Sequence, residues 1–219
     1  MMLRVAIFDL DGVLVDTAKY HYLAWKQLAS ELGFDFPLAE NEKLKGVSRM
    51  RSLEILLRTG RMEGRFTASE MAGLADRKNE RYVEYIKKLG KDEILPGARD
   101  CLLRFRELGL KTALGSASKN AGVILDRLEL GSLFDSIVDG TRTSRAKPDP
   151  EVFLLAARDL GADPAVCVVF EDAQAGLDAA KAGGMRTVAV GQPDNLTGYD
   201  AIVDGLHEVD PEDLVRRFV

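Results

Sequence analysis

The spacing of apolar residues changes character along the chain. Five residues from Val5 are rich in β-formers and are bounded by Gly12, which predicts a buried strand of the kind found in parallel sheets. From Tyr20 to Leu32, apolar residues recur three and four positions apart, which predicts a helix that ends at Gly33 and is capped by Thr17. The chain therefore begins with one strand followed directly by a helix.

Two further helical patterns follow a loop at residues 34–48, one around Leu53–Leu57 and one from about residue 67 to residue 89. This block contains no strand pattern. A helical segment of such length directly after the first strand predicts a small helical cap domain inserted into an α/β domain. We expect the cap at residues 16–92 and the α/β domain at residues 1–15 and 93–219.

Strands and helices alternate in the rest of the chain. The expected helices lie at residues 97–109, 119–128, 150–160 and 173–182, with a last one after Pro211. The expected strands lie at residues 111–115, 136–139, 166–170, 187–190 and 201–203. Alternation of this kind predicts a doubly wound parallel sheet covered by helices on both faces.

Composition restricts the partners of the chain. Its 219 residues carry 30 basic and 35 acidic side chains, a net charge of −5, without a basic cluster, which argues against nucleic acid and anionic membranes. No apolar run approaches the roughly 20 residues that span a bilayer. Cys101 and Cys167 lie in apolar stretches typical of core thiols. We expect a soluble cytoplasmic monomer that acts on small molecules.

Acidic residues follow two of the predicted strands. Asp9 and Asp11 end the first strand, and Glu171 and Asp172 follow the strand at residues 166–170. Ligands of open α/β sheets bind outside the carboxyl ends of the strands, so these acids are expected to meet at one edge. Carboxylate oxygens suit Mg²⁺, which usually works beside substrate phosphates. The alternative for each acid alone is an ordinary polar loop residue.

Groups suited to an anion follow two other strands. The segment Ser116–Asn120 opens a helix whose N–H groups favour an anion, and the Ser116 hydroxyl can bond a phosphate oxygen. Lys147 lies among prolines, which fix it as a preorganised positive charge. A single lysine is more often a solvated surface group, but four strand ends with matching chemistry favour a phosphoryl-transfer site.

The motifs Asp9-Leu-Asp11-Gly-Val, Ser116, Lys147 and Glu171-Asp172 together resemble those of the haloacid dehalogenase superfamily. The cap is similar to that of the superfamily's mutases, which move a phosphoryl group between positions 1 and 6 of glucose. That further match covers nearly the whole chain and runs through Asp16-Thr17-Ala18, Tyr20-His21, Ala24-Trp25-Lys26, Leu44–Arg49, Arg77-Lys78-Asn79 and Ser116–Asn120.

The resemblance implies roles for the acids and for the groups around the phosphoryl. Asp9 would attack phosphorus and become an aspartyl-phosphate, and Asp11 would be the general acid and base. Mg²⁺ would be held by the carboxylates of Asp9, Glu171 and Asp172 and by the backbone carbonyl of Asp11. The resemblance places around the phosphoryl group Ser116, Lys147 and the N–H groups of Leu10, Asp11 and Ala117.

Arg49 is the candidate for binding a second, distal phosphate. A mutase must hold that phosphate at a fixed distance, because its bisphosphate intermediate is released, turned and rebound with the other end reacting. Without the resemblance, Arg49 would be interpreted as a solvated helix-end arginine. A charged helix face explains Lys78 almost as well as a binding role, and we expect Trp25 to be cap core. The full set implied to bind substrate is Thr17, His21, Trp25, Lys45, Gly46, Val47, Arg49, Lys78, Ser116, Ala117, Ser118, Lys119, Asn120 and Lys147.

Three functions stay open at this point. The preferred one is interconversion of β-D-glucose 1-phosphate and glucose 6-phosphate through the 1,6-bisphosphate. The second is a Mg²⁺-dependent phosphatase of small sugar phosphates, and the third is a non-catalytic phosphate-binding protein. Arg142 and Arg145 have no role in the resemblance.

Overall fold

The computed structural model describes residues 2–44, 48–193 and 196–218. Backbone contacts divide the chain into two compact units. The helical unit is Thr17–Lys88, and the sheet unit is Met1–Asp16 together with Leu89–Val219. These limits lie one to four residues from the expected ones. That the two units act as a cap domain and a phosphoryl-transfer domain stays a prediction.

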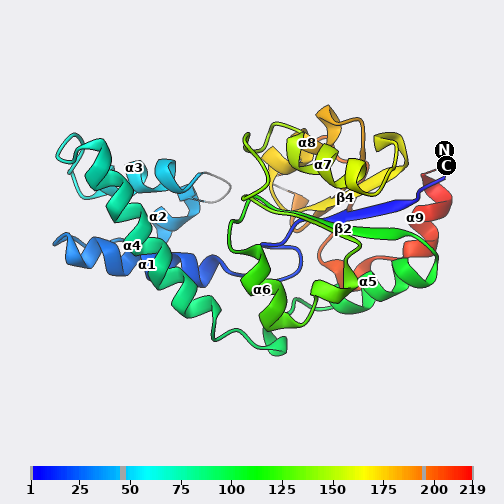
Figure 1. The fold of residues 1–219 in the computed structure, drawn as a ribbon, viewed down its shortest axis with the longest axis horizontal. Helices are drawn as coiled ribbons and strands as arrows, with labels where there is room; N and C mark the ends of the chain where they lie inside the picture. The colour runs from blue at the N-terminus through cyan, green and yellow to red at the C-terminus, as the bar shows by residue number, and fades with distance from the viewer. Residues whose placement is uncertain (1, 45–47, 194–195, 219) are drawn as a thin grey trace. The chain divides into compact units, whose positions relative to one another are not determined.

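The sheet unit is built on six parallel strands in the order β3-β2-β1-β4-β5-β6 (Figure 1), which confirms the expected α/β architecture. Each strand lies within about one residue of its predicted position. The strands are β1 (Val5–Phe8), β2 (Lys111–Gly115), β3 (Ser136–Val138), β4 (Cys167–Glu171), β5 (Arg186–Val190) and β6 (Ala201–Val203).

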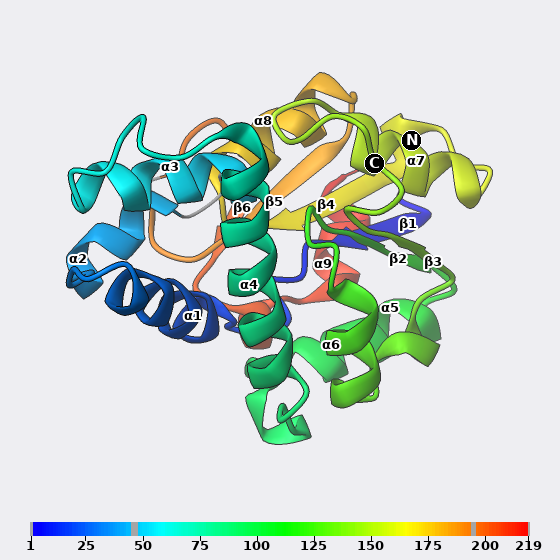
Figure 2. The same cartoon turned by 60° about the vertical axis from the view of Figure 1, so that its left-hand side comes forward.

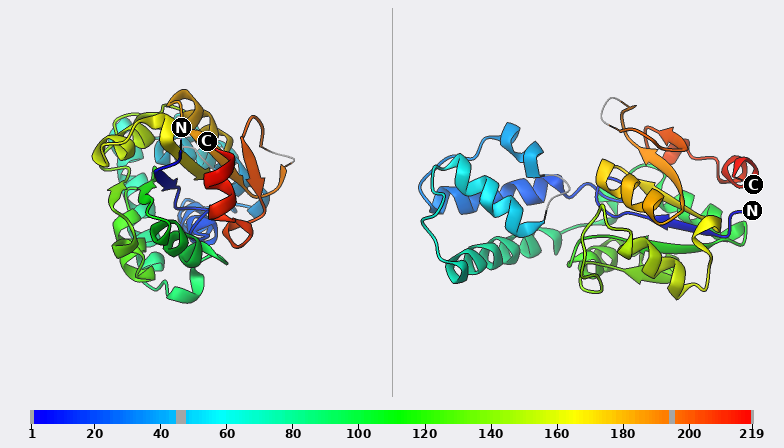
Figure 3. Two further views of the ribbon diagram at one scale, coloured as in Figure 1. Left: turned by 90° about the vertical axis from the view of Figure 1, so that its right-hand side faces the viewer. Right: turned by 90° about the horizontal axis from the view of Figure 1, so that it is seen from above.

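Helices cover both faces of this sheet. They are α5 (Ala98–Glu107), α6 (Ala121–Leu128), α7 (Glu151–Asp159), α8 (Gln174–Ala182) and α9 (Pro211–Arg217). The helices α7 and α8 lie on one face, and α5 and α6 lie on the other (Figures 1 and 2). The start of β1 and the end of α9 lie at the same end of this unit (Figure 3).

The central strands β1 and β4 are buried on both faces, which explains their continuous apolar sequences. On one face, Phe8 and Phe170 stack with ring centroids 4.7 Å apart, and Phe105 of α5 meets both rings edge-on. On the other face, Ile7 and Val169 join a core cluster with Phe153 of α7. Side chains that alternate along each strand therefore fill two separate cores.

The helical unit consists of α1 (Ala18–Glu31), α2 (Leu38–Asn41), the 3-10 helix η1 (Glu42–Leu44), α3 (Arg49–Thr59) and α4 (Ala68–Ile86) (Figure 2). Its core joins Trp25, Leu28, Leu53, Leu56 and Leu74. No described residue of this unit is in a strand. Over the described part of the whole chain, every helix is too short or too polar to span a bilayer.

Three local details differ from the sequence predictions. The expected loop at residues 34–48 contains α2 and η1. The helix expected from residue 119 begins at Ala121, because the two preceding residues form a turn. Thr17 stands at the amino end of α1, but its fully buried side chain makes no capping hydrogen bond.

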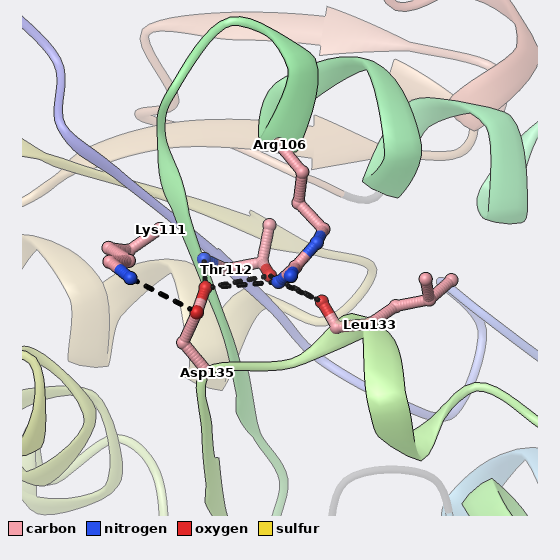
Figure 4. A network of polar contacts seen from close by, with 5 residues as sticks. All are labelled: Arg106, Lys111, Thr112, Leu133 and Asp135. Atoms are coloured by element: carbon pink, nitrogen blue, oxygen red, sulfur yellow. Dashed lines mark hydrogen bonds and ion pairs between the residues drawn. The ribbon is translucent and has the colours of Figure 1, made fainter.

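A network of hydrogen bonds and ion pairs joins β2 to the segment before β3 at the amino ends of these strands (Figure 4). One Asp135 oxygen accepts the backbone N–H of Thr112 at 2.9 Å, and the other accepts from Lys111 Nζ at 3.3 Å. Arg106 Nη1 donates to Asp135 at 3.2 Å and to the Leu133 carbonyl at 3.1 Å. Partial burial raises the pKa of Asp135, but these donors outweigh it and hold the pKa below its ordinary value.

Replacement of Asp135 by alanine is expected to lower the free energy of unfolding by about 1–3 kcal/mol at pH 7, because the Thr112 N–H loses a charged acceptor. Since the native pKa is lowered, the stabilisation is present above the unfolded-state pKa of about 3.9 and is lost as pH falls through the native pKa. Urea unfolding at several pH values measures it. The exposed Asp126 of α6 gives a control variant, Asp126→Ala, and equal losses for both variants would contradict the assignment.

Candidate active site

Two acids meet where β1 and β4 end. Phe8 of β1 is in register with Phe170 of β4, and the N–H of Asp9 donates to the Phe170 carbonyl at 3.0 Å. The pairing places Asp9 beside Glu171, and their residues are only 6% and 2% exposed. Parallel pairing thus brings together two carboxylates that lie 162 positions apart in the sequence.

Asp172 completes a group of three carboxylates. One oxygen from each of Asp9, Glu171 and Asp172 lies within 4.8 Å of the others. Burial and the charge of Asp9 raise the pKa of Glu171. Asp172 reaches solvent, yet desolvation by neighbouring atoms and the charges of Asp9 and Asp11 raise its pKa to about 7. Like charges held this close favour a bound cation.

Lys147 supplies one positive charge to this group. Its Nζ donates to Asp9 Oδ1 at 2.6 Å and to Glu171 Oε2 at 2.7 Å, and its side chain is 10% exposed. Burial opposes the charge of Lys147, but the two carboxylates outweigh it and raise the lysine's pKa. In the part of the chain that the structure describes, the Lys147 ammonium faces three carboxylates, so the donor set fits a further hard cation such as Mg²⁺. The sequence prediction that these four side chains share one edge agrees with this geometry.

Two glycines make room for the acids, and sequence reasoning did not identify this role. A Cβ on Gly12, whose φ is +78°, would lie 2.0 Å from Asp172 Oδ2. A Cβ on Gly176 in α8 would lie 2.0 Å from Glu171 Cδ. The available signals were a glycine directly after the Asp9–Asp11 pair and an isolated glycine within a predicted helix. Both permit a close approach that any side chain would block.

The turn after β2 contributes hydroxyl groups to the same edge. Phe8 is in register with Leu114, so Ser116 comes just beyond the strand end, one position past the level of Asp9. Ser116 is 1% exposed, and its Oγ accepts the Ser118 N–H at 3.1 Å. Ser118 Oγ in turn accepts the Asn120 N–H at 3.2 Å. These bonds shape the turn that leads into α6.

The other residues of this turn, together with Asp11, lie on the rim of the sheet unit. Ala117 and Lys119 are exposed, and Asp11 is half-buried. The backbone around Asp11 is ordered by a bond from the Gly12 N–H to the Val15 carbonyl at 2.8 Å. The groups proposed to meet the substrate here therefore have access to solvent.

In the helical unit, Lys78 is buried rather than part of a charged surface face. It is 3% exposed, and its Nζ lies 4.7 Å from the Trp25 ring centroid and 4.8 Å from that of Tyr82. The His21 ring stacks on Tyr82 with centroids 3.9 Å apart. We call His21, Trp25 and Tyr82 the Lys78 cage. Tyr82 was not singled out from the sequence, where it reads as an ordinary core position.

His21 is a hydrogen-bond acceptor within this cage. Lys78 Nζ donates to His21 Nδ1 at 2.6 Å. Burial, followed by the charges of Lys78 and Arg49, holds the pKa of His21 well below its usual value. The lowered pKa favours the neutral imidazole, and a neutral ring that accepts the Lys78 bond at Nδ1 carries its hydrogen on Nε2.

Arg49 begins α3 and contacts α4. Its Nη2 donates to Asn79 Oδ1 at 2.8 Å, and its Nη1 lies 3.8 Å from an Asp76 oxygen. The Arg49 side chain is 32% exposed, so its guanidinium is bound by α4 but is still in part open to solvent. Thr17, also predicted to meet the substrate, is fully buried at the start of α1. The predicted positions Lys45, Gly46 and Val47 lie outside the described residues.

Known proteins resemble the chain over most of its length. A family model described as haloacid dehalogenase-like hydrolase matches residues 3–184. A β-phosphoglucomutase of Bacillus subtilis is 44% identical over 92% of this chain and 89% of its own length. The crystal structure of a β-phosphoglucomutase from Clostridium difficile has a TM-score of 0.92 and 39% identity over 99% of this chain and 97% of that one. A phosphorylated carbohydrates phosphatase of Thermotoga maritima is 30% identical over 85% of this chain and 84% of its own length.

Gly176→Ala is expected to destabilise the sheet unit even though alanine favours helices. The added methyl group must push Glu171 away from Lys147. The matched change Gly122→Ala in α6 meets nothing within 4 Å and should stabilise by about 0.5–1 kcal/mol. Thermal unfolding of both variants measures the difference. Similar shifts of the two would show that Gly176 does not hold Glu171 in place.

Proposed function

Because this chain belongs to the haloacid dehalogenase-like hydrolase family, we propose that it is a phosphomutase that interconverts β-D-glucose 1-phosphate and D-glucose 6-phosphate. The observation that carries the proposal is the 44% identity to a β-phosphoglucomutase over 92% of the chain. The phosphatase named above is more distant, at 30%. Cytoplasmic location and a monomeric state stay predictions from the sequence.

Asp9 is proposed as the nucleophile. Lys147 Nζ lies 2.6 Å from Asp9 Oδ1 and offsets part of the negative charge that would repel a phosphoryl group. In the first half-reaction, an Asp9 oxygen forms a bond to phosphorus while the bond from phosphorus to the sugar oxygen breaks. The half-buried Asp11 gives its proton to the departing sugar oxygen.

The second half-reaction reverses these roles at the other end of the sugar. Asp11 takes a proton from the attacking hydroxyl, the new sugar oxygen–phosphorus bond forms, and the Asp9–phosphorus bond breaks. Ser116 and the N–H groups of the turn after β2 are proposed to bind the phosphoryl oxygens during transfer. The aspartyl-phosphate thus links the two monophosphates through a sugar 1,6-bisphosphate.

Mg²⁺ is the proposed cofactor. Asp9, Glu171 and Asp172 offer oxygens within 4.8 Å of one another, and the backbone carbonyl of Asp11 is the proposed fourth protein ligand. When bound, the ion would neutralise charge on the phosphoryl oxygens. Lys147 would then balance the remaining negative charge of Asp9 and Glu171.

The proposed function is tested by mixing the protein with Mg²⁺ and β-D-glucose 1-phosphate, with and without the 1,6-bisphosphate, and following glucose 6-phosphate and inorganic phosphate. A mutase forms glucose 6-phosphate as the main product and is activated by the bisphosphate. Inorganic phosphate as the main product would favour the second candidate, a sugar-phosphate phosphatase, which the similarity to the Thermotoga maritima protein supports. If neither glucose 6-phosphate nor inorganic phosphate formed, both candidate functions would be overturned.

Arg49→Ala is expected to separate the two phosphate sites. If Arg49 binds the distal phosphate, its loss removes a charge-assisted contact and weakens reaction with sugar phosphates by on the order of a few kcal/mol. Acetyl phosphate has no second phosphate, so its transfer to Asp9 should be nearly unchanged. We also expect a larger share of phosphoryl groups to reach water.

The matched control is Arg51→Ala, two residues along α3. Arg51 pairs with Glu54 at 2.6 Å, and its side chain is 53% exposed. This variant should behave as the unmodified protein with both donors. Equal losses with sugar phosphate and acetyl phosphate in Arg49→Ala, or no loss with either, would contradict a distal-phosphate role.

A further inference from the structure

Lys147 is carried by a connection that has no helix or strand of its own. Residues 139–150 link β3 to α7, and neither element includes Lys147. Yet the Lys147 ammonium lies within 2.7 Å of two different carboxylates, on Asp9 and Glu171. A side chain held this closely requires that the backbone beneath it is also fixed.

Glu151, the first residue of α7, fixes that backbone. Its Oε2 accepts the Arg145 N–H at 2.6 Å and the Ser144 N–H at 2.9 Å. Its Oε1 accepts the Ser144 hydroxyl at 2.9 Å. The Glu151 carboxylate thus accepts three hydrogen bonds from Ser144 and Arg145, the residues that precede Ala146-Lys147. The Glu151 side chain is 18% exposed, so these bonds are partly shielded from water.

A second carboxylate of α7 anchors the start of the same connection. Arg142 Nη1 and Nη2 donate to the two oxygens of Asp159 at 2.7 and 3.1 Å, and Nη1 also donates to the Ile137 carbonyl at 2.9 Å. Asp159 is the last residue of α7. The connection is therefore tied to both ends of one helix, and Arg142 gains a role that the sequence did not reveal.

The same helix also contacts the Lys147 side chain through an aromatic ring. The Phe153 ring of α7 lies 4.8 Å from Lys147 Nζ. Gly115 at the end of β2 leaves room for that ring, because a Cβ there would lie 2.7 Å from Phe153 Cδ1. Glu151 is two residues away on the same helix, and its own N–H donates to Asp149 Oδ1 at 2.9 Å. Backbone and side chain of Lys147 thus share one rigid support.

We propose that Glu151 is a positioning residue for phosphoryl transfer: it holds residues 144 and 145 so that the Lys147 ammonium stays between Asp9 and Glu171. The proposal rests on the proposed function, in which Lys147 offsets charge at the phosphoryl site. Glu151 touches neither the reacting atoms nor the acids in the contacts described above, so it acts through the backbone. Because misplacement of a catalytic group by about 1 Å can cost about a hundredfold in rate, loss of this support should slow the transfer step.

The test compares Glu151→Ala and Glu151→Gln with the unmodified protein in single-turnover phosphorylation of Asp9 by acetyl phosphate with Mg²⁺. Glu151→Ala should slow the reaction by about tenfold to a hundredfold. Glu151→Gln retains one acceptor oxygen, so its phosphorylation rate should lie between those of Glu151→Ala and the unmodified protein. General destabilisation would not give this partial rescue. The control is Glu208→Ala, in the 3-10 helix η6 (Leu206–Glu208), which removes an exposed carboxylate that accepts the Asp204 N–H at 2.9 Å.

A second readout does not depend on activity. Labelling of lysines with an amine reagent, followed by mass spectrometry, should show Lys147 several-fold more reactive in Glu151→Ala, with the exposed Lys181 as internal reference and Glu208→Ala unchanged. The proposal would be overturned if Glu151→Ala were phosphorylated at a rate within about twofold of the unmodified rate, because misplacement of Lys147 predicts a larger loss. Unchanged labelling of Lys147 would also overturn it. If the unmodified protein formed no phosphoenzyme, the proposed function itself would fail, while the labelling would still report whether Glu151 holds Lys147.

Discussion

The ion pairs from Lys147 to Asp9 and Glu171 are the contacts on which the proposed site depends. They join a connection, the end of β1 and the end of β4 at distances of 2.6 and 2.7 Å, in a setting almost closed to solvent. Removing one partner of a buried ion pair costs about 3–5 kcal/mol, because the other charge is left uncompensated. The register of β1 with β4, the space at Gly176 and the support from α7 all serve to keep these charges within reach of one another.

The helical unit also contains a buried ammonium, but its neighbours are aromatic rings and not carboxylates. Lys78 is buried among the rings of the Lys78 cage and donates to a neutral His21. A buried ammonium against aromatic faces is stabilised electrostatically. Burial, together with that charge, lowers the pKa of the neighbouring imidazole. Arg49 lies on the next helix, paired with Asn79 and partly exposed, which leaves its guanidinium able to bind an anion.

The sheet and the acids of the site could be predicted from sequence because both follow from local pattern. Apolar runs identify the strands, and parallel pairing then brings Asp9 and Glu171 to one edge. Burial of Lys78 could not be predicted, since its enclosure depends on α1 and α4 packing together, and a lysine on a helix usually faces water. Glu151 was missed for a similar reason: its bonds to Ser144 and Arg145 exist only when the connection folds back onto α7.

The central claim is that Asp9, held beside Lys147, is the group that receives the phosphoryl. The most direct measurement is to quench the protein rapidly after mixing with Mg²⁺ and β-glucose 1,6-bisphosphate, reduce the acyl phosphate with borohydride, and locate the modified residue by peptide mass spectrometry. We predict one modified position, Asp9, which is lost in Asp9→Asn although that amide fills the same volume. A phosphate ester at another residue such as Ser116, which borohydride leaves unreduced, or a phosphoenzyme that persists in Asp9→Asn, would contradict the account.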